Sequence, residues 1–197
     1  MSRWDPGAQG RLADAALELF AEQGFDRTTV AGIAARAGLT ERTFFRHYAD
    51  KREVLFAGDR LAHHIAARLA EVPSGVTPLE AVTVVMEDAS EVTTARADWA
   101  RQRAEIVAAH PELRERELAK MGMLATVMAE GLRERGVSAA PAQLTAEIAV
   151  LAFRLAYERW AAGPPSVPAA SLVRVLLAEL RDAVTSTCPS PTAPTPP

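Results

Sequence analysis

The chain of 197 residues is poor in cysteine and in aromatic residues. Its single cysteine, Cys188, excludes an intramolecular disulfide and fits a reducing cytoplasm. No apolar run approaches the roughly 20 residues that span a bilayer, and the start lacks the pattern of a secretion signal. These absences predict a soluble cytoplasmic protein with no membrane partner.

Patterns of enzymes and metal sites are also lacking. The sequence contains no phosphate-binding loop, no nucleophile elbow and no metal-ligand spacing. His63 and His64 are neighbours on a predicted helix, so their side chains diverge by about 100° and cannot bind one ion together. We expect no catalysis, no cofactor and no metal.

Strand patterns are absent as well, and helical periodicity fills most of the chain. Proline and glycine separate predicted helices at about 8–23, 30–37, 40–47, 51–71, 79–93, 97–109, 111–135, 141–162 and 168–186. The tail from Pro189 has five prolines in nine residues and cannot form a core. The fold class is therefore all-α, with an N-terminal three-helix domain at 1–50, a helical domain at 51–187 and a disordered tail at 188–197.

The segment from Thr28 to Lys51, TTVAGIAARAGLTERTFFRHYADK, contains two short helices joined at Gly38. Thr28 or Thr29 can cap the first helix and Thr40 the second, because a threonine oxygen accepts a free amide hydrogen of the first turn. Gly38 has no Cβ and can adopt positive φ, which lets the chain reverse sharply. Such a helix-turn-helix can lay its second helix in the major groove of DNA.

Positive charge is concentrated in the same segment. Residues 27–52 contain six basic and two acidic side chains, a net charge of +4, whereas the whole chain carries −3 and the remainder therefore −7. A solvated basic face is the simplest explanation of such a run. Its coincidence with the two-helix unit favours nucleic-acid binding by this part of the chain.

The string GLTERTFFRHYADK, preceded by TTVAGIAARA and the lead-in ALELFAEQGFDRTTV, resembles the signature of the tetracycline-repressor-like (TetR) family. The resemblance is strong from about Arg11 to Leu55 and elsewhere rests on length and helical character. It implies a three-helix DNA-binding domain and a larger helical domain for effector binding and dimerisation. It also implies repression of transcription that a small molecule relieves.

The resemblance assigns roles to individual residues. Positions that usually touch phosphates are Thr28 or Thr29, Thr40, His47 and Lys51, and those that usually face bases are Glu41, Arg42, Thr43 and Arg46. Arg42 can donate twice to guanine O6 and N7, which discriminates by roughly 1 to 3 kcal/mol. Glu41 can accept from cytosine, hold an arginine in position, or simply favour the helix start as an acid. Asp50 is expected to cap a helix starting at Lys51, where free amides and the ammonium can meet a phosphate.

Two positions depart from the family pattern. Phe45 stands where the family often has tyrosine, so a hydroxyl contact to the DNA backbone is missing. Its ring can pack on sugars and thymine methyl groups or belong to the domain core. Gly32 stands where an acidic residue would complete a capping box with Thr29, which weakens that helix start by up to about 1 kcal/mol.

The predicted helix 141–162 is apolar on two sides. One stripe contains Leu144, Ile148, Leu151 and Leu155, and the other Val150, Phe153, Tyr157 and Trp160. One stripe can serve the subunit's own core and the other a symmetric partner, and the sequence does not decide between them; burial of the whole helix in one subunit is the alternative. We expect a homodimer through a four-helix interface with helix 168–186, as the resemblance also implies. The candidate interface residues are Val150, Phe153, Tyr157, Trp160, Val173, Leu177, Leu180 and Val184.

An unknown small-molecule effector would need an adaptable apolar cavity, which thioethers and aromatic rings can line. The candidates are Met86, Trp99, Met121, Met123, Met128 and Phe153, with Arg103 and His110 as polar contacts. Ordinary core packing is the alternative for each apolar candidate, and His110, next to Pro111, can equally cap a turn.

A helical adaptor whose basic domain binds an acidic protein or a nucleic acid non-specifically is the alternative function. Double-stranded RNA is a poor target for it, since the deep major groove excludes a recognition helix. A strong preference for one palindromic DNA duplex would favour a regulator, and equal binding to any polyanion the adaptor.

Overall fold

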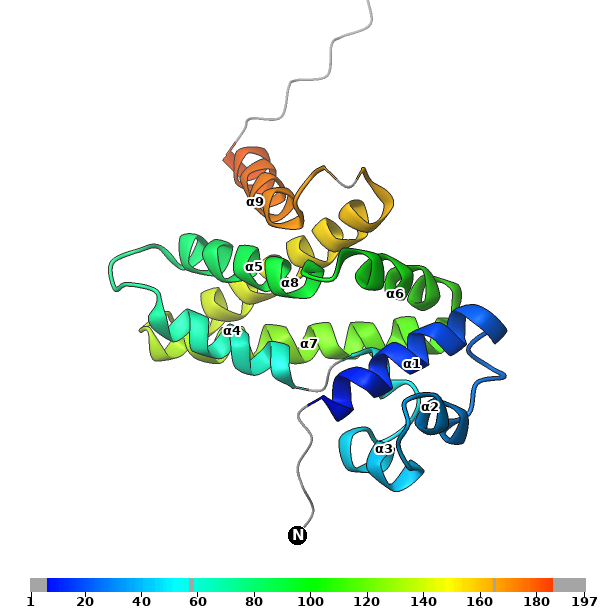
Figure 1. Cartoon of the computed structure of the whole chain (residues 1–197). Coiled ribbons are helices and arrows are strands. Elements are labelled where there is room, and N and C mark those ends of the chain that lie inside the picture. Colours follow the sequence, from blue (N-terminus) through cyan, green and yellow to red (C-terminus); the bar gives the residue numbers. More distant parts are fainter. Residues whose placement is uncertain (1–6, 57–58, 165, 186–197) are drawn as a thin grey trace, which may run out of the picture.

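Helices make up the regular structure of the chain in the computed structural model, which describes residues 7–56, 59–164 and 166–185 (Figure 1). No strand occurs within those ranges, so the predicted all-α fold class is confirmed for them. The predictions for Cys188 and for the proline-rich tail concern residues outside the described ranges.

The first three helices are α1 (Ala8–Gln23), α2 (Val30–Arg36) and α3 (Glu41–His47). Thr29 caps α2, where its hydroxyl accepts from Gly32 N at 3.1 Å, and Thr40 caps α3, where its hydroxyl accepts from Thr43 N at 3.2 Å. Gly38 lies between the two helices with a φ of 67°, the left-handed conformation that glycine adopts without strain. The predicted helix-turn-helix is therefore present.

The predicted fourth helix from Lys51 is wrong at its start. Residues 53–55 form a short 3₁₀ helix, η1 (Glu53–Leu55), and the fourth α-helix, α4 (Arg60–Glu71), begins only later. Asp50 caps the short turn instead, since its Oδ1 accepts from Arg52 N at 2.7 Å. The Leu55 carbonyl accepts from Arg103 Nε at 2.8 Å, a bond that replaces the one a continuing α-helix would make.

Five longer helices complete the chain: α5 (Pro78–Thr94), α6 (Ala97–Ala109), α7 (Pro111–Glu134), α8 (Ala139–Ala162) and α9 (Ala169–Thr185). Thr77 and Glu80 form the capping box expected at the start of α5, with Pro78 in its first turn. In Figure 1, α4 and α6 lie beside α7, while α8 packs against α5, α6, α7 and α9. All five ranges agree with the sequence prediction to within two residues at each end.

The buried apolar residues fall into two large cores. We call helices α1 to α3 with η1 the head, and helices α4 to α9 the body. The body core joins α4, α5, α7, α8 and α9, and the head core joins α1, α2, α3 and η1. Ile106, Val107 and Leu113, at the corner between α6 and α7, belong to the head core. Val54 and Leu55 of η1 belong to it too, so the body and the residues that follow the helix-turn-helix together complete a domain too small to be stable alone.

The two apolar stripes of α8 have different environments, which corrects the interface prediction. Val150, Phe153 and Trp160 are 3 to 5% exposed and lie in cores of the subunit itself. Tyr157 is partly buried, and Val173 and Leu177 of α9 are buried too. The other stripe stands open, with Leu144 63% and Leu151 47% exposed. Of the predicted interface residues, Leu180 and Val184 remain exposed.

Helix α8 also corrects the statement that no segment has the length and composition of a membrane span. An 18-residue window within it reaches a mean hydropathy of 1.2, and 39% of that window is buried in the subunit. Its packing against four neighbouring helices explains this composition, because one face lines the core and the other carries the open stripe.

Candidate nucleic-acid interface

The outward face of α3 combines cationic and aromatic side chains. Phe44 is fully buried and anchors the helix, with its ring 5.5 Å from that of Tyr48. Glu41, Arg42 and Arg46 are exposed on the other side. Arg42 and Arg46 lie one turn apart, and neither forms a hydrogen bond or ion pair within the described residues. Both guanidinium groups are therefore available to a ligand of opposite charge.

Other basic residues of this segment are already occupied. Arg36 of α2 contacts Glu18 at 3.1 Å and Glu22 at 2.7 Å, and Arg52 contacts Asp50 at 2.6 Å. Arg27 is exposed just before α2, and its Nε donates to the Gln23 carbonyl at 2.6 Å without meeting an acid. Arg27 belongs to the basic run but was not predicted as a DNA contact, although its position before a helix start is a usable signal.

Lys51 has a different position from the one predicted. Its Nζ donates to the carbonyl oxygens of Phe25, Asp26 and Thr28 at 2.8, 3.3 and 3.2 Å, and it lies 4.2 Å from the centroid of the Phe25 ring. The ammonium thus fastens the loop between α1 and α2. The expected helix start, with free amides beside the ammonium, does not form at this residue.

Thr28 is wrong as a phosphate contact through its hydroxyl group. The residue is 1% exposed, and its Oγ1 donates to Gly24 O at 2.8 Å and accepts from Gln23 Nε2 at 3.2 Å. Thr29, the alternative, is exposed and its hydroxyl caps α2. The hydroxyls of Thr40 and Thr43 lie 3.1 Å apart at the start of α3.

His47 and Phe45 occupy opposite environments. Partial burial and, to a smaller extent, the positive charge of Arg46 lower the pKa of His47, so its ring is neutral near pH 7. Its Nε2 is buried and has no partner within the described residues. Phe45 is 55% exposed and meets Phe44 edge-on at 5.6 Å. Of the two alternatives for Phe45, a place in the core is therefore excluded.

The residues predicted to line an effector cavity do not converge. Met86, Met128 and Phe153 are packed in the body core, Met121 lies at its edge, and Met123 is 43% exposed on α7. Trp99 packs at the edge of the head core. The buried positions among them have ordinary packing roles, which is the alternative that the sequence left open for each apolar candidate.

The two polar candidates instead hold the head to the body. Arg103 donates from Nε to the Leu55 carbonyl and from Nη1 to Glu117 Oε1 at 2.9 Å. The His110 ring lies 5.3 Å from the Phe25 ring, and its Nδ1 is 2.8 Å from the Ile106 carbonyl oxygen. Both are structural contacts across the joint between the two cores.

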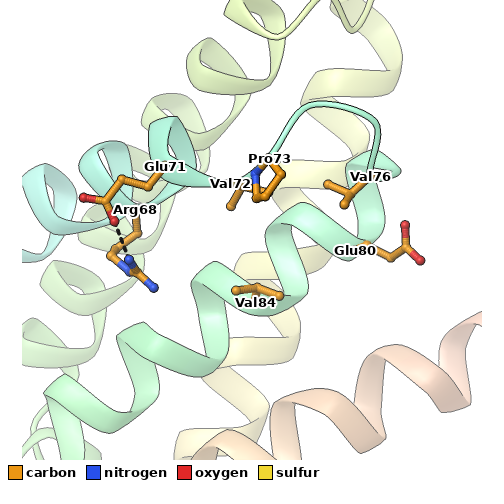
Figure 2. A pocket seen from close by; sticks show the side chains of 7 residues that line it. All are labelled: Arg68, Glu71, Val72, Pro73, Val76, Glu80 and Val84. Carbon is orange, nitrogen blue, oxygen red and sulfur yellow. Dashed lines mark hydrogen bonds and ion pairs between the residues drawn. The ribbon is translucent and has the colours of Figure 1, made fainter.

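Two clefts open on the surface of the body instead. The first, of about 190 Å³, lies between α4 and α5, and Figure 2 shows its lining residues Arg68, Glu71, Val72, Pro73, Val76, Glu80 and Val84. The second lies between α6, α8 and the start of α9, and Arg101 and Trp160 contribute to it. None of the eight predicted effector residues lines either cleft. The first cleft is lined by one stretch, residues 68–84, whereas the walls of the second come from segments far apart in the chain, which no local sequence pattern reveals.

No cluster of three or more potential metal ligands occurs among the described residues. His64 pairs with Asp88 of α5, whereas His63 does not take part in that pair.

Known proteins resemble this chain most clearly in its first three helices. The family model described as "Bacterial regulatory proteins, tetR family" matches residues 12–57. The HTH-type transcriptional regulator TcmR of Streptomyces glaucescens is 40% identical over 74 residues, which are 37% of this chain and 33% of that protein. The chain therefore aligns with about a third of the length of this curated relative.

Solved structures resemble the whole chain. A putative TetR-family transcriptional regulator from Syntrophomonas wolfei has a TM-score of 0.65 and 16% identity, and the match covers 93% of this chain and 98% of that one. The TetR-family repressor FadR of Thermus thermophilus, solved with lauroyl-CoA, has a TM-score of 0.54 and 26% identity over the same shares. The arrangement of a helix-turn-helix domain on a helical body is therefore shared beyond the segment of recognisable sequence.

Proposed function

The chain belongs to the TetR family of bacterial regulatory proteins through its N-terminal domain, and we propose that it is a sequence-specific DNA-binding transcriptional regulator. The observation that carries the proposal is the outward face of α3, where Arg42 and Arg46 stand one turn apart without acidic partners. A capped helix with such a face fits the major groove of B-form DNA.

The contacts to DNA divide into base reading and positioning. Arg42 reads a guanine through its two donors, and the exposed ring of Phe45 packs on thymine methyl groups and sugars. Glu41, Thr43 and Arg46 share this face. Phosphates are held at the starts of α2 and α3 by Arg27, Thr29 and Thr40, and beside the end of α3 by His47.

The regulator acts as a homodimer in this proposal. The open stripe of Leu144, Ile148, Leu151 and Leu155 on α8 meets its symmetric copy, together with Leu180 and Val184 of α9. Leucine and isoleucine at this heptad-like spacing suit a four-helix interface. A twofold axis then presents two α3 helices to successive major-groove turns, about 34 to 36 Å apart, so the operator is a palindrome.

We further propose repression that a small amphipathic molecule relieves. The repressor FadR of Thermus thermophilus was solved with lauroyl-CoA, and this chain shares its fold. A ligand releases DNA only if it binds the DNA-incompetent arrangement more tightly, by about 5.5 kcal/mol for a shift from 1:99 to 99:1. The α6–α7 corner, buried in the head core, is the element through which such a preference reaches α3.

In this proposal the protein is a cytoplasmic, non-enzymatic regulator that binds neither a membrane nor a cofactor. The relatives named above are transcriptional regulators, and their function needs access to DNA. The competing function is the adaptor that binds polyanions without sequence preference. The unequal roles of the basic residues favour the regulator, because Arg36, Lys51 and Arg52 are engaged within the domain while Arg42 and Arg46 point outward.

Selection of bound sequences from random duplex DNA tests the proposal directly. Enrichment of one palindromic sequence by the full chain supports a regulator. Recovery of a pool as random as the starting one, with equal binding to heparin, would favour the adaptor. Light scattering of the same preparation checks the dimer.

A further inference from the structure

The second cleft of the body lies where the end of α5, the first turns of α6, the end of α8 and the start of α9 meet. Its volume is about 230 Å³. Ala97, Val167, Pro168 and Ala169 provide apolar wall. Pockets for drug-sized molecules have volumes of about 300 to 1,000 Å³, so this one suits a smaller compound.

Arg101 gives the cleft its chemical character. Its Nη1 donates to the carbonyl oxygens of Ala161 and Gly163 at 2.6 and 2.9 Å, and its guanidinium carbon lies 4.4 Å from the centre of the Trp160 ring. These contacts fix the plane of the group. Its Nη2, however, is buried and has no hydrogen-bond acceptor within the described residues. A buried donor of a charged group is left without the partner that folding normally provides.

Two other arginines of the body, in contrast, have acidic partners. Arg103 pairs with Glu117 at 2.9 Å, and Arg174 pairs with Glu87 at 2.7 Å. No ion pair of Arg101 occurs among the described residues. Its positive charge is balanced only by two carbonyl dipoles and an aromatic ring, in a cleft large enough to admit a small anion.

We propose that this cleft binds a small monocarboxylate with an apolar body, of the size of a single-ring aromatic acid. The carboxylate supplies the acceptor that Arg101 Nη2 lacks, in the planar geometry that guanidinium groups favour, and it does so once the guanidinium shifts toward the cleft, because this atom is closed to solvent in the structure. The apolar body packs against Ala97, Val167 and Pro168. Glu91, exposed at the rim, repels a second negative charge and so disfavours phosphates and dicarboxylates.

The position of the cleft suggests how its occupant would be sensed, and this consequence rests on the proposed function. Arg101 is on α6, the same helix that carries Arg103, bonded to the Leu55 carbonyl, and Ile106, which is buried in the head core. A carboxylate that draws Arg101 toward the cleft acts on the helix that holds the head. The occupied protein then favours one spacing of the two α3 helices over the other.

Isothermal titration calorimetry of the full chain with benzoate tests the binding site without reference to DNA. Benzyl alcohol, a neutral molecule of nearly the same shape, is the matched ligand. We expect saturable benzoate binding, at least tenfold weaker binding of benzyl alcohol, and at least tenfold weaker benzoate binding to Arg101→Gln. Arg174→Gln removes an arginine that has an acidic partner and should bind benzoate like the parent chain.

A second variant keeps the test valid if Arg101→Gln does not fold. Ala97 is exposed at the start of α6, so Ala97→Leu fills the cleft without removing a charge or disturbing a core. It should fold and lose benzoate binding. The proposal would be overturned if either variant bound benzoate as tightly as the parent chain, or if the parent chain bound benzyl alcohol as tightly as benzoate. It would also be overturned if the parent chain showed no saturable binding at benzoate concentrations up to about 10 mM, ten times a Kd of about 1 mM.

The same titration repeated with operator DNA separates this inference from the proposed function. Benzoate binding without a change in DNA affinity would support the carboxylate site and contradict only its regulatory consequence. If the parent chain bound benzoate but showed no sequence-specific DNA binding, the proposed function would be contradicted and the carboxylate site would stand.

Discussion

The Nζ of Lys51 donates a 2.8 Å hydrogen bond to the carbonyl of Phe25 and lies 4.2 Å from the centre of the Phe25 ring. Phe25 also contacts the body, because its ring lies 5.3 Å from the ring of His110 at the α6–α7 corner. One lysine thus fixes the loop that sets the start of α2, and the loop in turn is fixed to the body.

Lys51→Met should therefore destabilise the fold. The change removes hydrogen bonds from a charged donor to three carbonyl oxygens together with a cation–π contact, for a loss of about 2 kcal/mol. For a chain of this length that loss lowers the Tm by about 4 to 8 °C. Arg52→Met, which removes an exposed ion pair, should change the Tm by about 2 °C or less. Calorimetry that finds an unchanged Tm for Lys51→Met would mean that the ammonium is free to hold a phosphate.

Arg42→Ala and Arg27→Ala should affect DNA binding in different ways. Loss of Arg42 should relax the preference at one base pair of each half-site, by about 1 to 3 kcal/mol. Loss of Arg27 should chiefly reduce the slope of log K against log salt, by about 2 for a dimer that loses one phosphate contact per subunit. Titrations of selected and single-substituted duplexes at several salt concentrations measure both. Identical profiles for the two variants would contradict the division into reading and positioning.

Leu151→Arg should produce a monomer. Leu151 is 47% exposed on the open stripe of α8, so an arginine there is tolerated by the subunit but places two like charges near the twofold axis. Leu118→Arg is the control, because Leu118 is 57% exposed on α7, outside the open stripe. Light scattering at micromolar concentration should give a monomer for Leu151→Arg and a dimer for Leu118→Arg. A dimeric Leu151→Arg variant would place the interface elsewhere.

Gly131→Ala should destabilise the packing of α4 on α7. A Cβ at this position would lie 2.6 Å from Cδ2 of Leu69, and Leu69 is 1% exposed and has little room to move. Because overpacking outweighs the gain in helix propensity, the free energy of unfolding should fall by about 1 kcal/mol. Gly122→Ala on the same helix meets no atom within 4 Å and should stabilise by about 0.5 to 1 kcal/mol.

A double variant separates the clash from other effects of Gly131→Ala. In a Leu69→Ala background the offending methyl group is gone, so Gly131→Ala should become neutral or stabilising. Denaturant unfolding of the four proteins gives the coupling between the two positions. An additive result would show that the two side chains do not compete for space.

Local signals explain why so much of the fold could be predicted. The caps at Thr29, Thr40 and Thr77 and the positive φ at Gly38 depend on a few neighbouring residues, which the sequence displays directly. The same locality allowed the exposed face of α3 to be recognised from the spacing around the buried Phe44.

Contacts between distant segments explain what the sequence did not show. Lys51 contacts carbonyls more than 20 positions earlier, and Arg103 ends the short helix at Leu55 from 48 positions away. The two stripes of α8 are similarly apolar, and only the placement of α5, α7 and α9 decides which one is covered. Methionines expected around a cavity pack in the core for the same reason.

The affinity ratio between the selected palindrome and a scrambled duplex of equal length, at one fixed salt concentration, tests the central claim most directly. The account predicts a ratio of about 100 or more for the full chain, and a marked fall in that ratio for Arg42→Ala with little change in binding to the scrambled duplex. A ratio near one for the full chain would contradict it.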